Sequence, residues 1–175
     1  MGSREEALHV LIKVYRDQAF PNVVLKGIQS SELDQGFITA LVYTTLQNDS
    51  FLWYQYHDLI KTKPALEIEL ILKMSLAQAF FMDKIPDYAL VNEAVDLAKK
   101  YEQGRASGFV NATLKKVLAR GRREVEVSGL EDASLRYSMP MWILRILAKQ
   151  YGETFAIAYA KQCLEVAPSY VRFNP

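Results

Sequence analysis

Residues 85–116, IPDYALVNEAVDLAKKYEQGRASGFVNATLKK, decide the fold that we predict from this sequence. The stretch contains two amphipathic helical patterns joined by a turn with glycines. Apolar residues recur in each pattern at spacings of three and four, which places them on one face of a helix. The apolar residues are Leu90, Val91, Ala94, Val95, Leu97, Ala98 and Tyr101 in the first pattern, and Phe109, Val110, Leu114, Val117 and Leu118 in the second. We therefore expect two helices that each bury one face.

The turn between these two patterns carries its own signals. Gly104 is placed to stop the first helix, because glycine takes positive φ without a steric penalty. Ser107 is expected to be the N-cap of the second helix. Asn92 and Asn111 lie near the start of each pattern, and we expect them to bond the backbone or a neighbouring helix rather than RNA.

Basic residues are concentrated toward the C-terminal side of this stretch. Residues 99–123 contain eight basic residues against one acid, a local charge of +7, whereas residues 67–98 carry −4. The net charge of the whole chain is only +1. A concentrated basic segment is an electrostatic footprint for phosphate. A solvated helix face followed by a basic loop would give the same pattern, so the charge alone leaves both interpretations open.

Five further helical patterns precede residue 85. They span residues 3–17, 22–28, 37–46, 51–60 and 66–82. Ser3 and Glu6 have the spacing of a capping box, and Asn22 is expected to cap the second pattern. The last pattern is apolar on nearly every side, which predicts a central helix covered by its neighbours. The sequence thus predicts an all-α bundle of about six to seven helices over residues 4–123.

The chain changes character after Arg123. Residues 124–134 have no helical face and are predicted to be a linker. Residues 135–175 contain two helical patterns, the second of them over residues 153–165, and are predicted to begin a connecting domain. The alternation of polar and apolar residues over 170–173 predicts the start of a strand. Because a strand needs a partner, we expect a further domain to follow.

Composition narrows the class of protein. Half of the 175 residues are hydrophobic and 23% are charged, which is typical of a folded domain. The single cysteine, Cys163, fits a reducing compartment, and with only His9 and His57 besides it no metal-ligand cluster is expected. No signal peptide precedes Lys13, and the apolar segment 70–82 is too short for a bilayer span. We predict a cytoplasmic protein that binds neither metal nor membrane.

Three blocks of this sequence resemble a known family. They are DQGFITALVYTTL at residues 34–46, the stretch 85–116, and LRYSMPMW at residues 135–142 with the later YG and VRFNP. The first two are similar to the NusB-like RNA-binding domain. The third resembles the connector of bacterial small-subunit ribosomal RNA cytosine-5 methyltransferases of the Sun, Fmu or RsmB type. The chain departs from the family at Gln35, Thr44, Gln47 and Met139, and two of these changes remove cationic side chains expected to contact RNA.

The resemblance implies an RNA-binding N-terminal region that helps to place 16S ribosomal RNA for a methyltransferase domain. That domain would follow Pro175 and would supply the S-adenosylmethionine site and the thiolate nucleophile. We therefore expect no catalytic residue and no cofactor within these 175 residues, and we expect Cys163 to be a buried structural thiol. The helical surface is also expected to dock on its own methyltransferase domain. The alternative is a NusB-type module for protein interaction in transcription antitermination.

The candidate RNA-binding residues are basic side chains at the helix ends. Their heads would contact phosphate without reading sequence. They are Lys115, Lys116 and Arg120 on the polar face of the last predicted bundle helix, Arg122 and Arg123 beyond it, Lys99 and Arg105 across the turn, and Arg4 near the N-terminus. The aromatic residues Trp53, Tyr54 and Tyr56 are expected to lie in the core rather than stack on bases. Asp96 is expected to pair with Lys100, and Trp142 to anchor the connector on the bundle.

Overall fold

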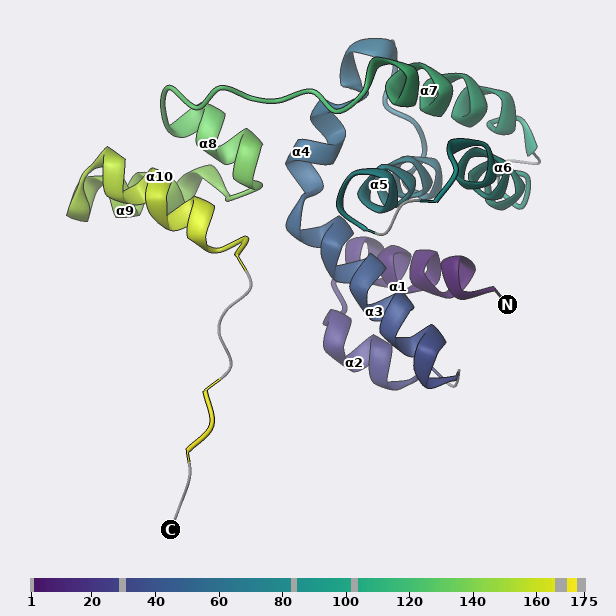
Figure 1. Cartoon of the computed structure of the whole chain (residues 1–175), viewed down its shortest axis with the longest axis horizontal. Helices are drawn as coiled ribbons and strands as arrows, with labels where there is room; N and C mark the ends of the chain where they lie inside the picture. The colour runs from purple at the N-terminus through teal and green to yellow at the C-terminus, as the bar shows by residue number, and fades with distance from the viewer. Residues whose placement is uncertain (1, 29–30, 83–84, 102–103, 166–169, 173–175) are drawn as a thin grey trace. The chain divides into compact units, whose positions relative to one another are not determined.

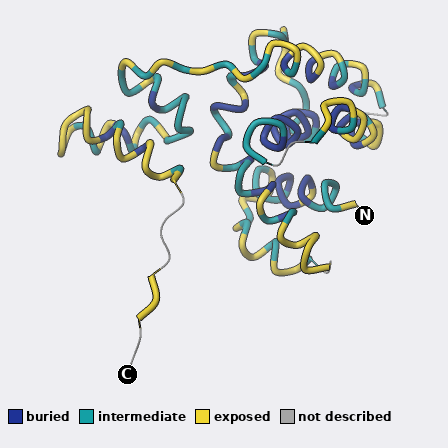
Figure 2. The backbone as a smooth tube through the Cα atoms, in the orientation of Figure 1, coloured by how far each residue is buried: buried dark blue, intermediate teal, exposed yellow. Residues whose placement is uncertain are grey.

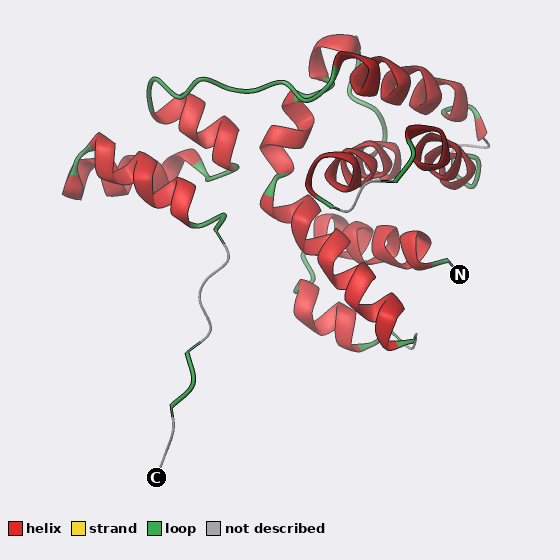
Figure 3. Cartoon of the chain, viewed as in Figure 1, coloured by secondary structure: helices red, strands yellow, loops and turns green. Residues whose placement is uncertain are grey.

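The computed structural model describes residues 2–28, 31–82, 85–101, 104–165 and 170–172. These residues form helices and loops without a strand, which confirms the predicted all-α class (Figure 3). The chain divides into two units, Met1–Glu124 and Val125–Pro175. None of the described helices is both long enough and apolar enough to cross a bilayer.

The first unit is built around one buried helix, α5 (Leu66–Phe81). Figure 1 shows α5 at its centre, with α7 and α1 on opposite sides. The surrounding elements are α1 (Ser3–Asp17), α2 (Pro21–Lys26), α3 (Glu32–Gln47), α4 (Asp49–Tyr54), the 3-10 helix η1 (His57–Leu59), α6 (Asp87–Ala98) and α7 (Ser107–Arg120). Every residue of α5 from Ile68 to Gln78 is buried, as the dark tube in Figure 2 shows. The prediction of a central helix over residues 66–82 is confirmed.

A charged side chain lies inside this core because it is paired. Lys73 is 3% exposed, and its Nζ lies 2.7 Å from Asp49 Oδ1 and 2.8 Å from Glu69 Oε1. Lys63 Nζ adds a second cation 3.1 Å from Glu69 Oε2. Tyr15 donates its hydroxyl to Asp49, and burial raises the pKa of Tyr15 far above its usual range. Removing either sign of charge from this cluster would leave the other buried without a partner.

Helix starts differ from the predictions most at α3, which begins at Glu32 rather than at residue 37, and by only one or two residues at α2 and α4. Gly2 is the N-cap of α1, so the predicted capping box is wrong; the Ser3 hydroxyl instead donates to Asp34 Oδ1 at 2.6 Å. Pro21 begins α2 and Phe20 is its N-cap, not Asn22, since proline is suited to the first helical turn.

The fourth predicted helix, over residues 51–60, is shorter than expected. The chain leaves helix α4 at Tyr54, turns, and continues as η1. Gln55 at this turn is fully buried, and its side chain bonds the backbone of Arg123, which holds the chain in the turn. Asn48 separates α3 from α4, in the interval between the predicted patterns 37–46 and 51–60.

A glycine with positive φ lies in the turn between α6 and α7 as predicted, but it does not directly follow the last residue of α6. Gly104 has φ +77°, while α6 already ends at Ala98. Ser107 is the first residue of α7 rather than its N-cap, and its hydroxyl donates to the Gly104 carbonyl at 2.8 Å. This bond ties the glycine turn to the start of α7.

The second unit contains α8 (Leu130–Tyr137), α9 (Met141–Tyr151) and α10 (Glu153–Gln162). Its small core consists of Ala133, Leu144, Ala156 and Ala160. The predicted linker 124–134 is wrong from residue 130 onward, because α8 begins there. The Asp132 carboxylate accepts the Ser128 N–H at 3.0 Å and the Ser128 hydroxyl at 2.5 Å, which fixes this helix start.

Two other expectations for the second unit are wrong. Cys163 is exposed in the turn after α10, because that helix ends at Gln162 rather than at residue 165. Residues 170–172 form no strand, and Phe173 lies outside the described residues. Trp142 is 65% exposed within its own unit, and its expected contact with the bundle stays a prediction.

Candidate nucleic-acid interface

Helix α7 positions the basic residues that we predicted to bind RNA. Its inner face is fixed by Val110, Leu114 and Val117, which are completely buried. Lys115 and Lys116 therefore point to the outer face and are exposed. Arg120 is the last residue of the helix, and Gly121 follows with φ +77°. The sharp turn at Gly121 brings the next residues back against α4 and η1.

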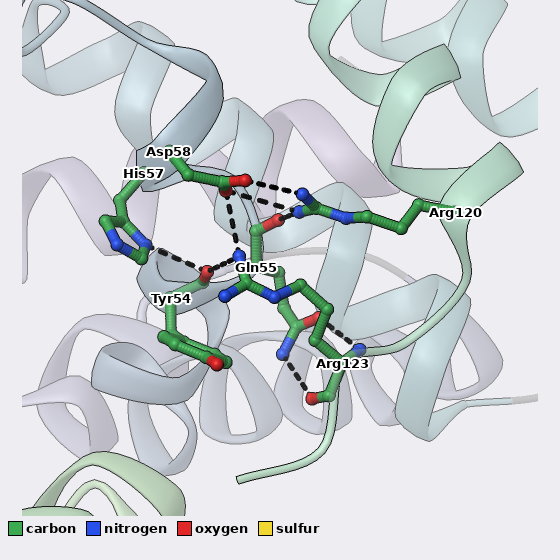
Figure 4. Close-up of polar contacts among 6 residues, drawn as sticks. All are labelled: Tyr54, Gln55, His57, Asp58, Arg120 and Arg123. Carbon is green, nitrogen blue, oxygen red and sulfur yellow. Dashed lines mark hydrogen bonds and ion pairs between the residues drawn. The ribbon is translucent and has the colours of Figure 1, made fainter.

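Arg120 is held by groups of the first unit rather than left free (Figure 4). Its guanidinium donates to Asp58 Oδ2 at 2.6 Å and also to the backbone carbonyl of Gln55. The hydrogen bond from Arg120 holds the pKa of Asp58 below its usual range. Arg120 thus fastens the end of α7 to η1.

Arg123 completes this attachment with both its backbone and its side chain (Figure 4). Its N–H donates to Gln55 Oε1 at 2.8 Å, and its carbonyl accepts from Gln55 Nε2 at 2.9 Å. Its guanidinium donates to Asp58 Oδ1 at 2.9 Å and lies 4.1 Å from the centre of the Tyr54 ring. We call Gln55, Asp58, Arg120 and Arg123 the clasp.

Three more of the predicted cations also have partners. Arg122 Nε lies 2.9 Å from Glu124 Oε1, and its guanidinium covers the Phe51 and Phe81 rings at 5.3 and 5.0 Å. Arg4 pairs with Glu93, donates to Gln78 Oε1 at 2.9 Å and lies over the Phe37 ring.

Lys99 pairs with Asp96 at 2.7 Å. Lys100 pairs with Glu5 at 2.7 Å, so the expected Asp96–Lys100 pair is wrong.

The remaining candidates are cationic side chains without an acidic partner. Across the described ranges, Lys115, Lys116 and Arg105 form no ion pair. All three are exposed, with Lys115 and Lys116 adjacent on α7 and Arg105 in the turn before it. The structure therefore separates the eight predicted residues into five that are engaged within the protein and three that are available to a ligand. Their contact with RNA stays a prediction.

Of the three aromatic residues expected in the core, only Tyr56 is buried; Tyr54 is partly buried and Trp53 is exposed. Tyr56 is fully buried, and the Tyr54 ring faces Arg123. Trp53 is 38% exposed but stacks on His57, with 4.4 Å between ring centres. A base would have to displace these partners in order to stack here.

A groove that we did not predict lies where α6 and α7 pack together. It has a volume of about 340 Å³ and is lined by Asp87, Tyr88, Val91, Asn92, Lys115, Leu118 and Ala119. Tyr88 is 72% exposed. Asn92 is exposed as well and makes no hydrogen bond with any described residue, so its predicted bracing role is wrong. The feature of the sequence that could have indicated this groove is the position of Tyr88 one helical turn before Val91 and Asn92.

The helical bundle with one buried central helix is a NusB-type fold, and the chain belongs to the NusB family, whose pattern matches residues 1–119. It is similar to the probable ribosomal RNA small subunit methyltransferase B of Bacillus subtilis, with 37% identity over 161 residues. That match covers 85% of this chain and 35% of the relative. A protein of the same description from Synechocystis is 26% identical over 87% of this chain and 36% of the relative.

Another kind of relative covers less of this chain. The transcription antitermination protein NusB of Bacillus licheniformis is 27% identical over 119 residues, which are 66% of this chain and 92% of that protein. The chain thus spans about a third of the methyltransferase relatives and nearly the whole of the antitermination relative.

Proposed function

We propose that this chain is the RNA-binding N-terminal region of a cytoplasmic S-adenosylmethionine-dependent 16S ribosomal RNA cytosine-C5 methyltransferase. One observation carries the proposal. The first unit, Met1–Glu124, makes up about 71% of the 175 residues. Matches that cover 85% and 87% of the chain must therefore include part of the α8–α10 unit, whereas a 66% match fits within the first unit alone. This difference favours the methyltransferase interpretation.

In this proposal Lys115, Lys116 and Arg105, which form no ion pair with a described residue, hold ribosomal RNA by its phosphates while a separate domain carries out methylation. The direction of Lys115 and Lys116 is set by the buried inner face of α7, whereas the clasp only secures the end of the helix. Lysine heads neutralise phosphate without reading bases. Placement on the correct nucleotide is then shared with the catalytic domain.

The residues of this chain do not fit a cofactor site. Its eight glycines are dispersed, and those with positive φ, Gly104, Gly121 and Gly152, are single residues at turns. None forms the glycine-rich loop that would cradle the cofactor. In this proposal the methyl transfer belongs to the remainder of the enzyme.

The proposal is tested by measuring the affinity of the chain for a small-subunit ribosomal RNA hairpin at several salt concentrations. Lys115→Glu/Lys116→Glu is expected to weaken binding about tenfold or more and to lower the slope of log K against log salt by roughly 1.4 to 1.8, two phosphate contacts. The matched control is Lys26→Glu/Lys61→Glu, an equal charge change at exposed residues of the first unit. Equal effects of both double variants would contradict a specific α7 interface, and no binding by wild type would refute the proposal.

A protein-interaction module is the second candidate. It is favoured by the match over 92% of an antitermination protein. Titration of the chain with purified small-subunit ribosomal proteins separates the two candidates. Tight binding of one such protein, with no affinity for the RNA hairpin, would support the interaction module instead.

A further inference from the structure

We propose that the groove between α6 and α7 binds a single unpaired nucleotide of RNA, with the base against Tyr88 and the phosphate on Lys115. This inference deepens the proposed function, on which it rests, by assigning a base-binding site beside the phosphate-binding cations. Tyr88 and Asn92 of this groove lie outside the basic segment 99–123, so the charge pattern did not indicate them.

The two helices present matching sets of side chains to the groove. Tyr88, Val91 and Asn92 of α6 are spaced at i, i+3 and i+4, and so share one face of that helix. Lys115, Leu118 and Ala119 repeat the same spacing on α7. The volume of about 340 Å³ lies at the lower end of the range of roughly 300–1,000 Å³ for small-ligand sites. A single nucleotide, rather than a long helix or strand, suits a groove of this size.

The chemistry of the lining changes along the groove in a way that a nucleotide matches. Val91, Leu118 and Ala119 provide an apolar wall against which the flat face of a base can lie. Tyr88 is 72% exposed and adds an aromatic face, and stacking on aromatic side chains is tolerant of base identity. Lys115 supplies one positive charge without an acidic partner among the described residues. A phosphate attached to the stacked base would lie toward this charge.

Two further groups can contact the polar edge of a base. The Asn92 amide offers both a donor and an acceptor and is not bonded to any described residue. The Asp87 carboxylate, also in the lining, accepts hydrogen bonds only and would repel a phosphate. Asp87 therefore orients the ligand, with the base amino groups toward the start of α6 and the phosphate toward Lys115. An acidic peptide would not meet this arrangement equally well.

The site requires an unpaired base, because a base inside a duplex has no free face to stack. This separates the groove from Lys116 and Arg105, which can contact the backbone of paired and unpaired RNA alike. The proposed interface then has two parts: cations that hold the backbone, and one groove that selects a flipped-out or single-stranded nucleotide.

The test compares Tyr88→Ala, Tyr88→Phe and the control Phe20→Ala in the full chain. Phe20 is 73% exposed in the same unit, so its removal matches the loss of an exposed aromatic ring away from the groove. Binding is measured to a single-stranded RNA 12-mer that contains one 2-aminopurine, and to the duplex of the same sequence. Tyr88→Ala should weaken single-strand binding by about 5- to 150-fold and abolish the quenching of 2-aminopurine by stacking. Tyr88→Phe and Phe20→Ala should bind within about threefold of wild type.

Duplex binding should be the same in all four proteins. Unchanged melting temperatures would show that the exposed substitutions leave the fold intact. If wild type binds the 12-mer and Lys115→Glu/Lys116→Glu weakens it, but Tyr88→Ala binds and quenches like wild type, the groove inference is overturned while the proposed function stands. If wild type binds neither RNA, both are overturned.

Discussion

The clasp predicts that Gln55 contributes to the stability of the first unit and not to RNA binding. Gln55→Ala removes two hydrogen bonds, of 2.8 and 2.9 Å, that satisfy the backbone N–H and carbonyl of Arg123. Each bond contributes about 0.5–1.5 kcal/mol, and Gln55 is fully buried, so the free energy of unfolding should fall by about 2–3 kcal/mol. The exposed Gln47 provides the matched control, Gln47→Ala, which should cost less than about 0.5 kcal/mol.

Urea unfolding followed by tryptophan fluorescence measures this loss. Trp53 lies in α4, two residues before Gln55, and Trp142 lies in the second unit. A Trp142→Phe background therefore leaves a single reporter on the first unit. With an m-value of about 1–3 kcal/mol/M, the Gln55→Ala midpoint should fall by about 0.7–3 M. This shift should appear without a change in m.

The RNA affinity of the folded variant separates a role of the clasp in stability from a role in RNA binding. Gln55→Ala should bind the RNA hairpin within about twofold of wild type at a temperature at which it stays folded, because it removes no exposed cation. A midpoint equal to that of Gln47→Ala would refute the structural role of the clasp. A large loss of RNA affinity by fully folded Gln55→Ala would show instead that the clasp belongs to the interface.

Three further outcomes follow from the buried and exposed groups. Lys73→Ala should lower the free energy of unfolding by about 3 kcal/mol in urea titrations, because Glu69 loses its buried cation, and Lys73→Met/Glu69→Gln should recover part of that loss. The stability difference between wild type and Asp58→Asn should be constant from pH 5 to 8 and shrink below about pH 4. The folded state lowers the pKa of Asp58, so the ionised carboxylate stabilises the fold at every pH above the pKa that Asp58 has in the unfolded chain. This stabilisation disappears as falling pH protonates the carboxylate in the folded protein. Cys163 should react with a thiol reagent in the native protein nearly as fast as in urea, and strong protection would contradict its exposure.

Local patterns carried most of the fold prediction. The apolar positions over residues 66–82 require burial on all sides, and only a central helix provides it, so α5 could be predicted without any knowledge of its neighbours. Helix starts were less certain because several adjacent residues can cap. Ser3 and Ser31 both bond the Asp34 carboxylate, and only the second acts as a cap. Ser3 does not cap its own helix, because its hydroxyl bonds Asp34 of α3, a contact that exists only once α1 packs on α3.

The candidate site was harder to predict because its contacts join distant parts of the chain. Asp58 lies 62 residues before Arg120, and no local spacing connects them. The groove likewise exists only once α6 packs on α7, and Tyr88 is an ordinary helix residue until then. Asn92 was assigned a bracing role because asparagine in a helix usually bonds nearby groups, whereas here it is exposed.

The net charge of the basic segment overstates the positive charge that a ligand can reach, because most of its cations pair with carboxylates in the fold. Read along the chain, residues 99–123 carry +7. In the fold, Asp58 serves both Arg120 and Arg123, while Glu124, Asp96 and Glu5 pair with Arg122, Lys99 and Lys100. A phosphate would have to compete with a carboxylate at each of those positions, so Lys115, Lys116 and Arg105, which form no ion pair with a described residue, attract it more strongly than these cations do. Because phosphate contacts alone distinguish no sequence, a site with so few of them needs a second source of selectivity. In our proposal the adjoining groove, with its exposed tyrosine and an asparagine that bonds no described residue, provides one.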